Sequence, residues 1–90
     1  MAKVVFTANL GRYTGGVAET RAAGERVCDL LQALDEAIPG IRHYLVTDQG
    51  SLRRHVSIFV DGEAVADRSL LTDEIGPEST VHILQALSGG

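Results

Sequence analysis

The stretch that decides the fold is His55-Val56-Ser57-Ile58-Phe59-Val60-Asp61-Gly62. Residues 55–60 predict a β-strand, because branched apolar side chains alternate along them with Ser57 and Phe59 on the opposite face. Asp61-Gly62 follows at once, and this dipeptide is a strong signal for a two-residue hairpin turn. We therefore expect residues 63–66 to form a short return strand.

Two segments near the start of the chain also have the alternation of strands. In residues 3–9, Val4, Phe6 and Ala8 point toward one face, and residues 17–22 alternate again. Residues 10–16 between them contain three glycines and predict the turn of a hairpin. Gly15-Gly16 has neither a dinucleotide-binding nor a P-loop spacing around it, so these glycines are expected to supply positive φ in the turn.

One segment has the helical period. In residues 25–38, apolar side chains recur at i, i+3, i+4, i+7 and i+11, which aligns them on one stripe. These side chains are Val27, Leu30, Leu31, Leu34 and Ile38. Gly24 is expected to be the N-cap, and Pro39-Gly40 ends the helix. Residues 41–46 predict a further short helical turn, followed by a polar loop at 47–51.

The last predicted strand, residues 80–85, places His82 and Leu84 outward. Apolar contacts from a loop are expected before it, at Leu70, Leu71 and Ile75. The order of segments favours an α+β roll, in which a mixed four- to five-stranded sheet wraps one main helix. We expect residues 1–85 to form this domain and residues 86–90 to form a flexible C-terminal tail that ends in a diglycine.

Size and charge limit the functions that the chain can have. A domain of 90 residues has little room for a deep active-site cleft, which favours a carrier or binding module over an enzyme. Its net charge of −4 argues against nucleic-acid binding, and Arg53-Arg54, the one adjacent basic pair, is expected on a solvated loop or rim.

Cysteine content and hydropathy suggest where the protein is found. The single cysteine, Cys28, cannot form an internal disulfide and fits a reducing compartment. No stretch has the eighteen consecutive apolar residues of a membrane span, and the N-terminus lacks the apolar core of a signal peptide. We therefore expect a cytoplasmic protein that does not contact membranes.

Four segments and the C-terminus match a known pattern. They are the strand at 3–6, the helix at 27–38, the strand and turn at 56–62, and the closing 79–84 that leads to Gly89-Gly90. In this order they resemble the β-grasp, ubiquitin-like sulfur carriers of the MoaD/ThiS type. Residues 50–56 look most like the cysteine-biosynthetic subgroup. The chain departs from the pterin-pathway form at Gln85-Ala86-Leu87, where that form often has prolines, and at Thr7 and Ser57, where it tends to be larger and apolar.

The resemblance implies a carrier whose reactive group is the carboxylate of Gly90. A terminal carboxylate is an anion and a poor electrophile at neutral pH, so it must be activated first. The family implies an E1-like adenylyltransferase that uses ATP with Mg, a sulfur donor enzyme that makes a thiocarboxylate, and a sulfur-accepting synthase. Gly89, Ser88 and Leu87 would thread the end into a narrow partner site, because glycine has no Cβ. The carrier itself would bind no cofactor and catalyse no reaction, although it could be the small subunit of a synthase complex.

Alternation also suggests where partners bind. Phe59, Leu84, His82 and Val5 point away from the helix-packed face of the predicted sheet, and an exposed apolar patch of this kind is typical of an interface. The alternative is that a loop covers these side chains.

Two other classes of function remain open. The protein could be a ubiquitin-like modifier that is conjugated through Gly90, or a non-covalent β-grasp binding module in which the diglycine is incidental. A hydrolase or metal enzyme comes last, because His43, His55 and His82 lack metal-ligand spacing. Cys28 lies beside the apolar helix stripe and is expected to have a packing role.

Overall fold

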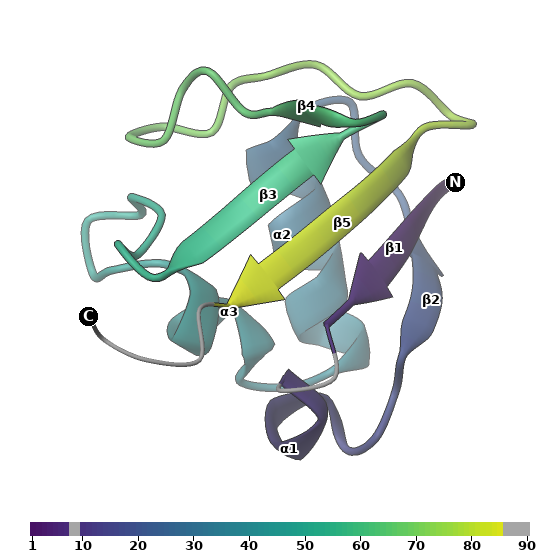
Figure 1. Cartoon of the computed structure of the whole chain (residues 1–90), viewed down its shortest axis with the longest axis vertical. Helices are drawn as coiled ribbons and strands as arrows, with labels where there is room; N and C mark the ends of the chain where they lie inside the picture. The colour runs from purple at the N-terminus through teal and green to yellow at the C-terminus, as the bar shows by residue number, and fades with distance from the viewer. Residues whose placement is uncertain (8–9, 86–90) are drawn as a thin grey trace.

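The strands form one mixed sheet with the order β2-β1-β5-β3-β4 (Figure 1). This computed structural model describes residues 1–7 and 10–85. The strands are β1 (Ala2–Phe6), β2 (Glu19–Ala22), β3 (Val56–Val60), β4 (Glu63–Ala64) and β5 (Thr80–Gln85). β1 and β5 pair in parallel although they lie at opposite ends of the described chain, and the other neighbours are antiparallel. The predicted α+β β-grasp roll is therefore confirmed.

The main helix, α2 (Val27–Ala37), crosses one face of the sheet (Figure 1). Its apolar stripe and the inward residues of the strands form one core, in which the helix contributes Val27, Leu30, Leu31 and Leu34. The strands contribute Val4, Phe6, Val56, Ile58, Val81 and Ile83. The period-2 and period-3.6 patterns thus meet in one apolar layer. No helix among the described residues is long and apolar enough to cross a membrane.

The start of α2 differs from the prediction. Its N-cap is Arg26 and not Gly24, and no side chain caps it. A loop supplies the missing acceptors: the Val27 N–H donates to the Asp73 carbonyl at 3.0 Å, and the Cys28 N–H to the Leu71 carbonyl at 2.9 Å. The first N–H groups of a helix have no partner within it, so these bonds fix the loop against the helix. Gly24 has another role, because its backbone passes directly against the first turn of α2.

The prediction of a plain turn at residues 10–16 is wrong. This segment contains a short helix, α1 (Gly11–Thr14), which ends at Gly15 with a φ of 69°. Leu10, immediately before it, is fully buried, and the Thr14 hydroxyl donates to the Val17 carbonyl at 2.8 Å. Tertiary burial and this side-chain bond therefore stabilise a turn of helix that Gly11 disfavours, and Gly15 ends it in the left-handed conformation that glycine adopts readily. The positive φ expected at Gly15 and Gly16 is confirmed.

The hairpin after β3 forms as predicted, but its return strand is shorter than predicted. Asp61 and Gly62 both have positive φ, 51° and 88°, as the two-residue turn requires. The return strand β4 has two residues instead of four. Leu70, predicted to make apolar contacts, is 67% exposed. The short helix predicted at 41–46 is present as α3 (Ile41–Leu45).

Candidate functional site

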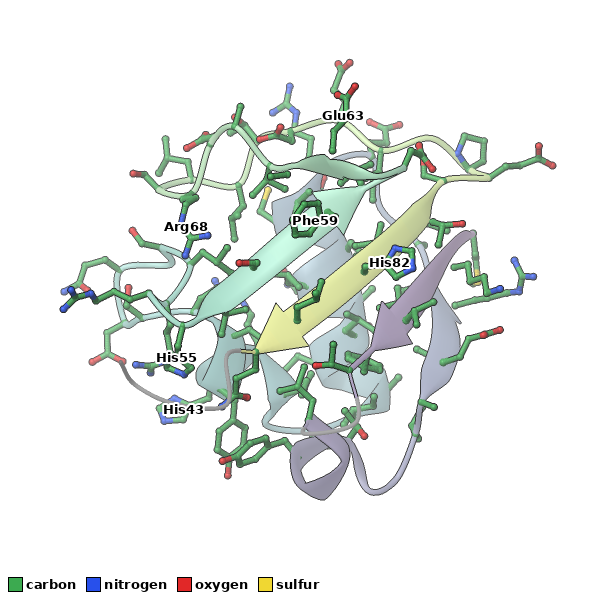
Figure 2. The ribbon with its side chains drawn as sticks, in the orientation of Figure 1. His43, His55, Phe59, Glu63, Arg68 and His82 are labelled. Carbon is green, nitrogen blue, oxygen red and sulfur yellow. The ribbon has the colours of Figure 1, made fainter. Side chains whose placement is uncertain are left out.

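The outer face of the sheet brings together side chains from three neighbouring strands. His82 on β5 is in register with Val5 on β1 and with Phe59 on β3, so the three lie side by side across the strands. Leu84 follows on the same face of β5, in register with Ser57. Figure 2 shows Phe59 and His82 on the face of the sheet opposite α2. The fold therefore assembles the four residues that alternation placed outward.

These residues line a shallow groove of about 300 Å³. Its walls are formed by Val5, Phe6, Thr7, Phe59, Gly62, His82, Ile83 and Leu84. Val5, Phe59 and Leu84 are half-buried and His82 is exposed. Both α2 and α3 lie behind the sheet, so neither helix covers the groove (Figure 1). Half-buried apolar side chains around an open groove are typical of a surface that a second protein covers.

β5 ends at one end of this face. Gln85, the last described residue, pairs with Val56 at the start of β3. Its N–H donates to the Thr7 hydroxyl at 3.4 Å, which ties the end of β5 to the end of β1. Thr7 and Gly62 were not among the predicted site residues, because neither is apolar and only the strand pairing brings them to the groove. Leu87, Ser88, Gly89 and Gly90 lie outside the described residues.

Two stacked tyrosines connect the helices at the same end of the sheet. The ring centroids of Tyr13 on α1 and Tyr44 on α3 are 3.9 Å apart, and the rings are inclined by 34°. His43 lies edge-on to Tyr44, with 6.2 Å between centroids. Aromatic pairs at such distances add to the packing of the elements that carry them. No local pattern predicts this pair, because the two tyrosines are far apart in the chain.

Several titratable side chains of the described residues have structural roles. No three His, Cys, Asp or Glu residues in this part of the chain are placed to hold a metal ion. Cys28 is half-buried and packs against the core, in agreement with the role predicted for it. Asp61, at the other end of β3, accepts bonds from the Thr80 N–H at 2.9 Å and the Ser79 hydroxyl at 2.8 Å. These two bonds hold the pKa of Asp61 below its usual 3.8 and stabilise the turn.

Fold and site together define a small ubiquitin-like protein of the β-grasp type, with an open apolar sheet face and a C-terminal strand that ends beside it. The sequence matches the ThiS family over residues 4–90, and the chain belongs to that family. Members of this kind are small sulfur carriers and are not themselves enzymes. In a direct sequence search, no curated protein matches the chain.

Solved structures agree with this assignment. CysO from a BexX/CysO complex of Amycolatopsis orientalis superimposes with a TM-score of 0.87 at 27% identity, and the match covers 100% of both chains. CysO of Mycobacterium tuberculosis, described as an antigen, has a TM-score of 0.86 at 28% identity, over 97% of this chain and 100% of that one. The small archaeal modifier protein 1 of Methanosarcina acetivorans has a TM-score of 0.79 at 26% identity, over 99% and 95% of the two chains.

Proposed function

We propose that this protein is a sulfur carrier whose Gly90 carboxylate is adenylated by an E1-like adenylyltransferase and then converted to a thiocarboxylate. The observation that supports this most directly is the family match, which extends through Gly89-Gly90. The similarity to two CysO proteins over nearly the whole chain favours a role in cysteine biosynthesis or in the synthesis of a related sulfur metabolite.

The chemistry requires two substitutions, both carried out by partner enzymes. A carboxylate oxygen of Gly90 attacks the α-phosphorus of Mg-bound ATP, and pyrophosphate leaves. Hydrosulfide supplied by the donor enzyme then attacks the carbonyl carbon of the acyl-adenylate, and AMP leaves, so that a C–S bond replaces the C–O bond to phosphate. The product, a thiocarboxylate, transfers its sulfur to an acceptor bound by the synthase. Because ATP is consumed, we expect the reaction in the cytoplasm.

The structure of the described residues suits this role. The groove around Phe59 offers an apolar surface for a partner, and β5 delivers the following residues from the end of the same face. A partner that binds the groove would therefore hold the base of the tail close to its own active site. This arrangement reduces the translational freedom that the tail must lose when it enters that site.

A second function has one specific observation in its favour. The small archaeal modifier protein 1 shares the fold at 26% identity, and its name describes a protein modifier. A modifier would use the same adenylation at Gly90, but its acyl group would be transferred to a lysine amine of another protein. The two functions differ at the acceptor, which the carrier does not encode.

Intact mass spectrometry separates the two proposals. The protein, ending at Gly90, is incubated with the host's E1-like adenylyltransferase, ATP, Mg and a sulfide source. We expect a mass gain that corresponds to one oxygen replaced by sulfur, located at residue 90 by fragmentation. The matched control has extra residues fused after Gly90 and should not react.

Other outcomes of this experiment would contradict the carrier function. Adducts on lysines of other proteins would favour the modifier. If neither product forms with an active enzyme, and deletion of Gly90 has no effect in the host, the diglycine is incidental and the protein is a non-covalent binding module.

A further inference from the structure

Basic side chains gather at the end of the sheet where β5 ends. We call this surface the basic end, and its members are Arg42, His43, Arg53, Arg54, His55 and Arg68. Residues 53–55 come directly before Val56, which pairs with Gln85 at the end of β5. Figure 2 shows His43 and His55 beside this end, whereas Glu63 lies at the opposite end of β3. The chain is acidic overall, yet four of its seven arginines belong to this end.

Specific hydrogen bonds hold the basic end together. The Arg53 guanidinium donates to the His43 carbonyl from Nε and from one terminal nitrogen, at 3.2 and 3.1 Å. The Arg68 guanidinium donates to the carbonyls of Arg53 and Val56, at 2.7 and 2.8 Å. All of these acceptors are neutral carbonyl groups, so the bonds order the guanidinium groups without cancelling their charge. Arg53 and Arg68 are therefore preorganised and still cationic.

The described carboxylates do not neutralise this surface. Among the described residues, the ion pair within 4 Å is Lys3–Glu19, on β1 and β2 at the far edge of the sheet. Asp35 and Asp48 line a hollow next to Arg42 and His43, and they are the acidic residues that border the basic end there. The Asp35 carboxylate accepts the backbone N–H groups of Gly40 and Arg42, at 3.1 Å each. Asp67 directly precedes Arg68, and its carboxylate accepts bonds from the Leu70 N–H and the Thr72 hydroxyl. The four arginines therefore have three carboxylates near them, and the surface keeps a positive excess.

We propose that the basic end binds an acidic rim around the active-site entrance of the adenylating enzyme that receives Gly90. This inference rests on the proposed function. Five residues follow Gln85, and a chain of that length spans at most about 17 Å. The domain itself measures 24 Å across its shortest extent. An enzyme that takes residue 90 into a narrow site must therefore approach the end of β5 closely, and it meets the basic end there.

The positive charge of the basic end determines which charge its partner surface must carry. Like charges facing one another across an interface oppose association, whereas an acidic rim would steer the carrier toward the enzyme tail-first. Nucleic acid is a poorer fit to the same cations, because the rest of the chain is acidic and would be repelled by phosphates. The basic end therefore selects an acidic protein surface.

Charge reversal of exposed arginines tests the proposal. Arg42→Glu with Arg54→Glu replaces two exposed cations of the basic end and leaves in place Arg53 and Arg68, whose guanidinium groups bond the backbone. Arg21→Glu with Arg26→Glu is the matched control, since it makes the same change in net charge at exposed positions on β2 and ahead of α2. Adenylation by the host's E1-like adenylyltransferase is followed by pyrophosphate release, and binding of the same enzyme is measured by fluorescence anisotropy.

We expect kcat/KM for the Arg42/Arg54 pair to fall about ten-fold or more at low ionic strength, with little change for the control pair. The difference in kcat/KM between the two variants should disappear in about 1 M salt, where the Debye length is about 3 Å. Lysine at both positions should preserve the wild-type value. Equal losses in both pairs, or a loss independent of salt, would overturn the proposal while wild-type adenylation leaves the proposed function intact.

Two further outcomes are decisive. If the Arg42/Arg54 variant loses affinity for a labelled duplex oligonucleotide while enzyme turnover is unchanged, the basic end is a nucleic-acid site and the proposal is wrong. If the wild-type protein neither binds the enzyme nor is adenylated by it, the proposed function and this inference fail together.

Discussion

Gly24 is the position at which the smallest change should have the largest effect on stability. A Cβ at this residue would lie 2.7 Å from the Leu30 backbone nitrogen, 3.0 Å from its Cα and 3.2 Å from the Asp29 carbonyl carbon. These are backbone atoms in the first turn of α2, and no rotamer change can move them. Restoring an ordinary contact of 3.4 Å requires a shift of about 0.7 Å in β2 or in α2.

The cost of Gly24→Ala follows from that geometry. Overpacking that displaces a buried element costs about 2 kcal/mol, and the backbone at φ +157° is disfavoured for alanine by about 1 kcal/mol more. For a domain of this size, about 3 kcal/mol lowers Tm by roughly 15 °C. Gly40→Ala is the matched control, because Gly40 also has positive φ, +92°, but nothing lies within 4 Å of its Cβ position. It should lose about 1 kcal/mol.

Urea unfolding followed by far-UV circular dichroism measures both variants, since the chain has no tryptophan to report by fluorescence. Equal stabilities for the two alanine variants would show that backbone conformation alone determines the cost, and the close approach of residue 24 to α2 would then be wrong. A larger loss at Gly40 would contradict the packing of α2 on the sheet.

Two further predictions concern the turn and the groove. Because the pKa of Asp61 is lowered in the folded state, its carboxylate stabilises the fold above pH 3.8, and this contribution is lost as the pH falls toward the lowered pKa. Asp61→Asn should therefore lower the urea midpoint at pH 7 and matter less at pH 3, whereas Asp48→Asn should change neither; a deficit that is the same at both pH values would refute this. Phe59→Asp should cost about 1 kcal/mol of stability and weaken enzyme binding about ten-fold, whereas Ile58→Asp, at a 1% exposed position, should unfold the domain by burying an unpaired charge. Unfolding of the Phe59 variant would place that residue in the core.

The order of apolar and polar residues within a segment was enough to predict β3, its turn and α2. Alternation along 55–60 followed by Asp61-Gly62 corresponds to β3 and its tight turn, and the apolar stripe of 25–38 corresponds to α2. These signals are reliable because each side chain faces the core or solvent according to its position in the period.

The features that could not be predicted from the sequence depend on contacts between residues that are distant in the chain. α1 forms because Leu10 is buried, and α2 begins at Val27 because carbonyls of Leu71 and Asp73 accept its first N–H groups. Neither the burial of Leu10 nor these carbonyl acceptors can be predicted from residues adjacent in the sequence. The basic end is missed for the same reason: Arg53-Arg54 is adjacent in sequence, but the fold brings Arg68 to it by hydrogen bonds.

The candidate site likewise has features that local patterns predict and features that depend on the pairing of distant strands. Alternation alone placed Phe59 and His82 outward, whereas their alignment with Val5 requires the parallel pairing of β1 with β5, which no local pattern encodes. Interfacial use of these residues stays a prediction. The role of Gly90 was inferred from its chemistry and from family resemblance, and residue 90 lies outside the described structure.

The six residues of β5 contribute to the core, to the groove and to the end of the sheet. Val81 and Ile83 are fully buried, His82 and Leu84 line the groove, and Gln85 leads to the tail. The strand is hydrogen-bonded on both sides, to β1 and to β3, so the base of the tail is fixed to the best-connected part of the sheet. Under the proposed function, each partner that binds the groove or the basic end would meet the end of β5 at Gln85, which the sheet holds in one position. The same coupling means that substitutions in β5 affect stability and recognition together, so β3 and the basic end are the places where recognition can be tested separately.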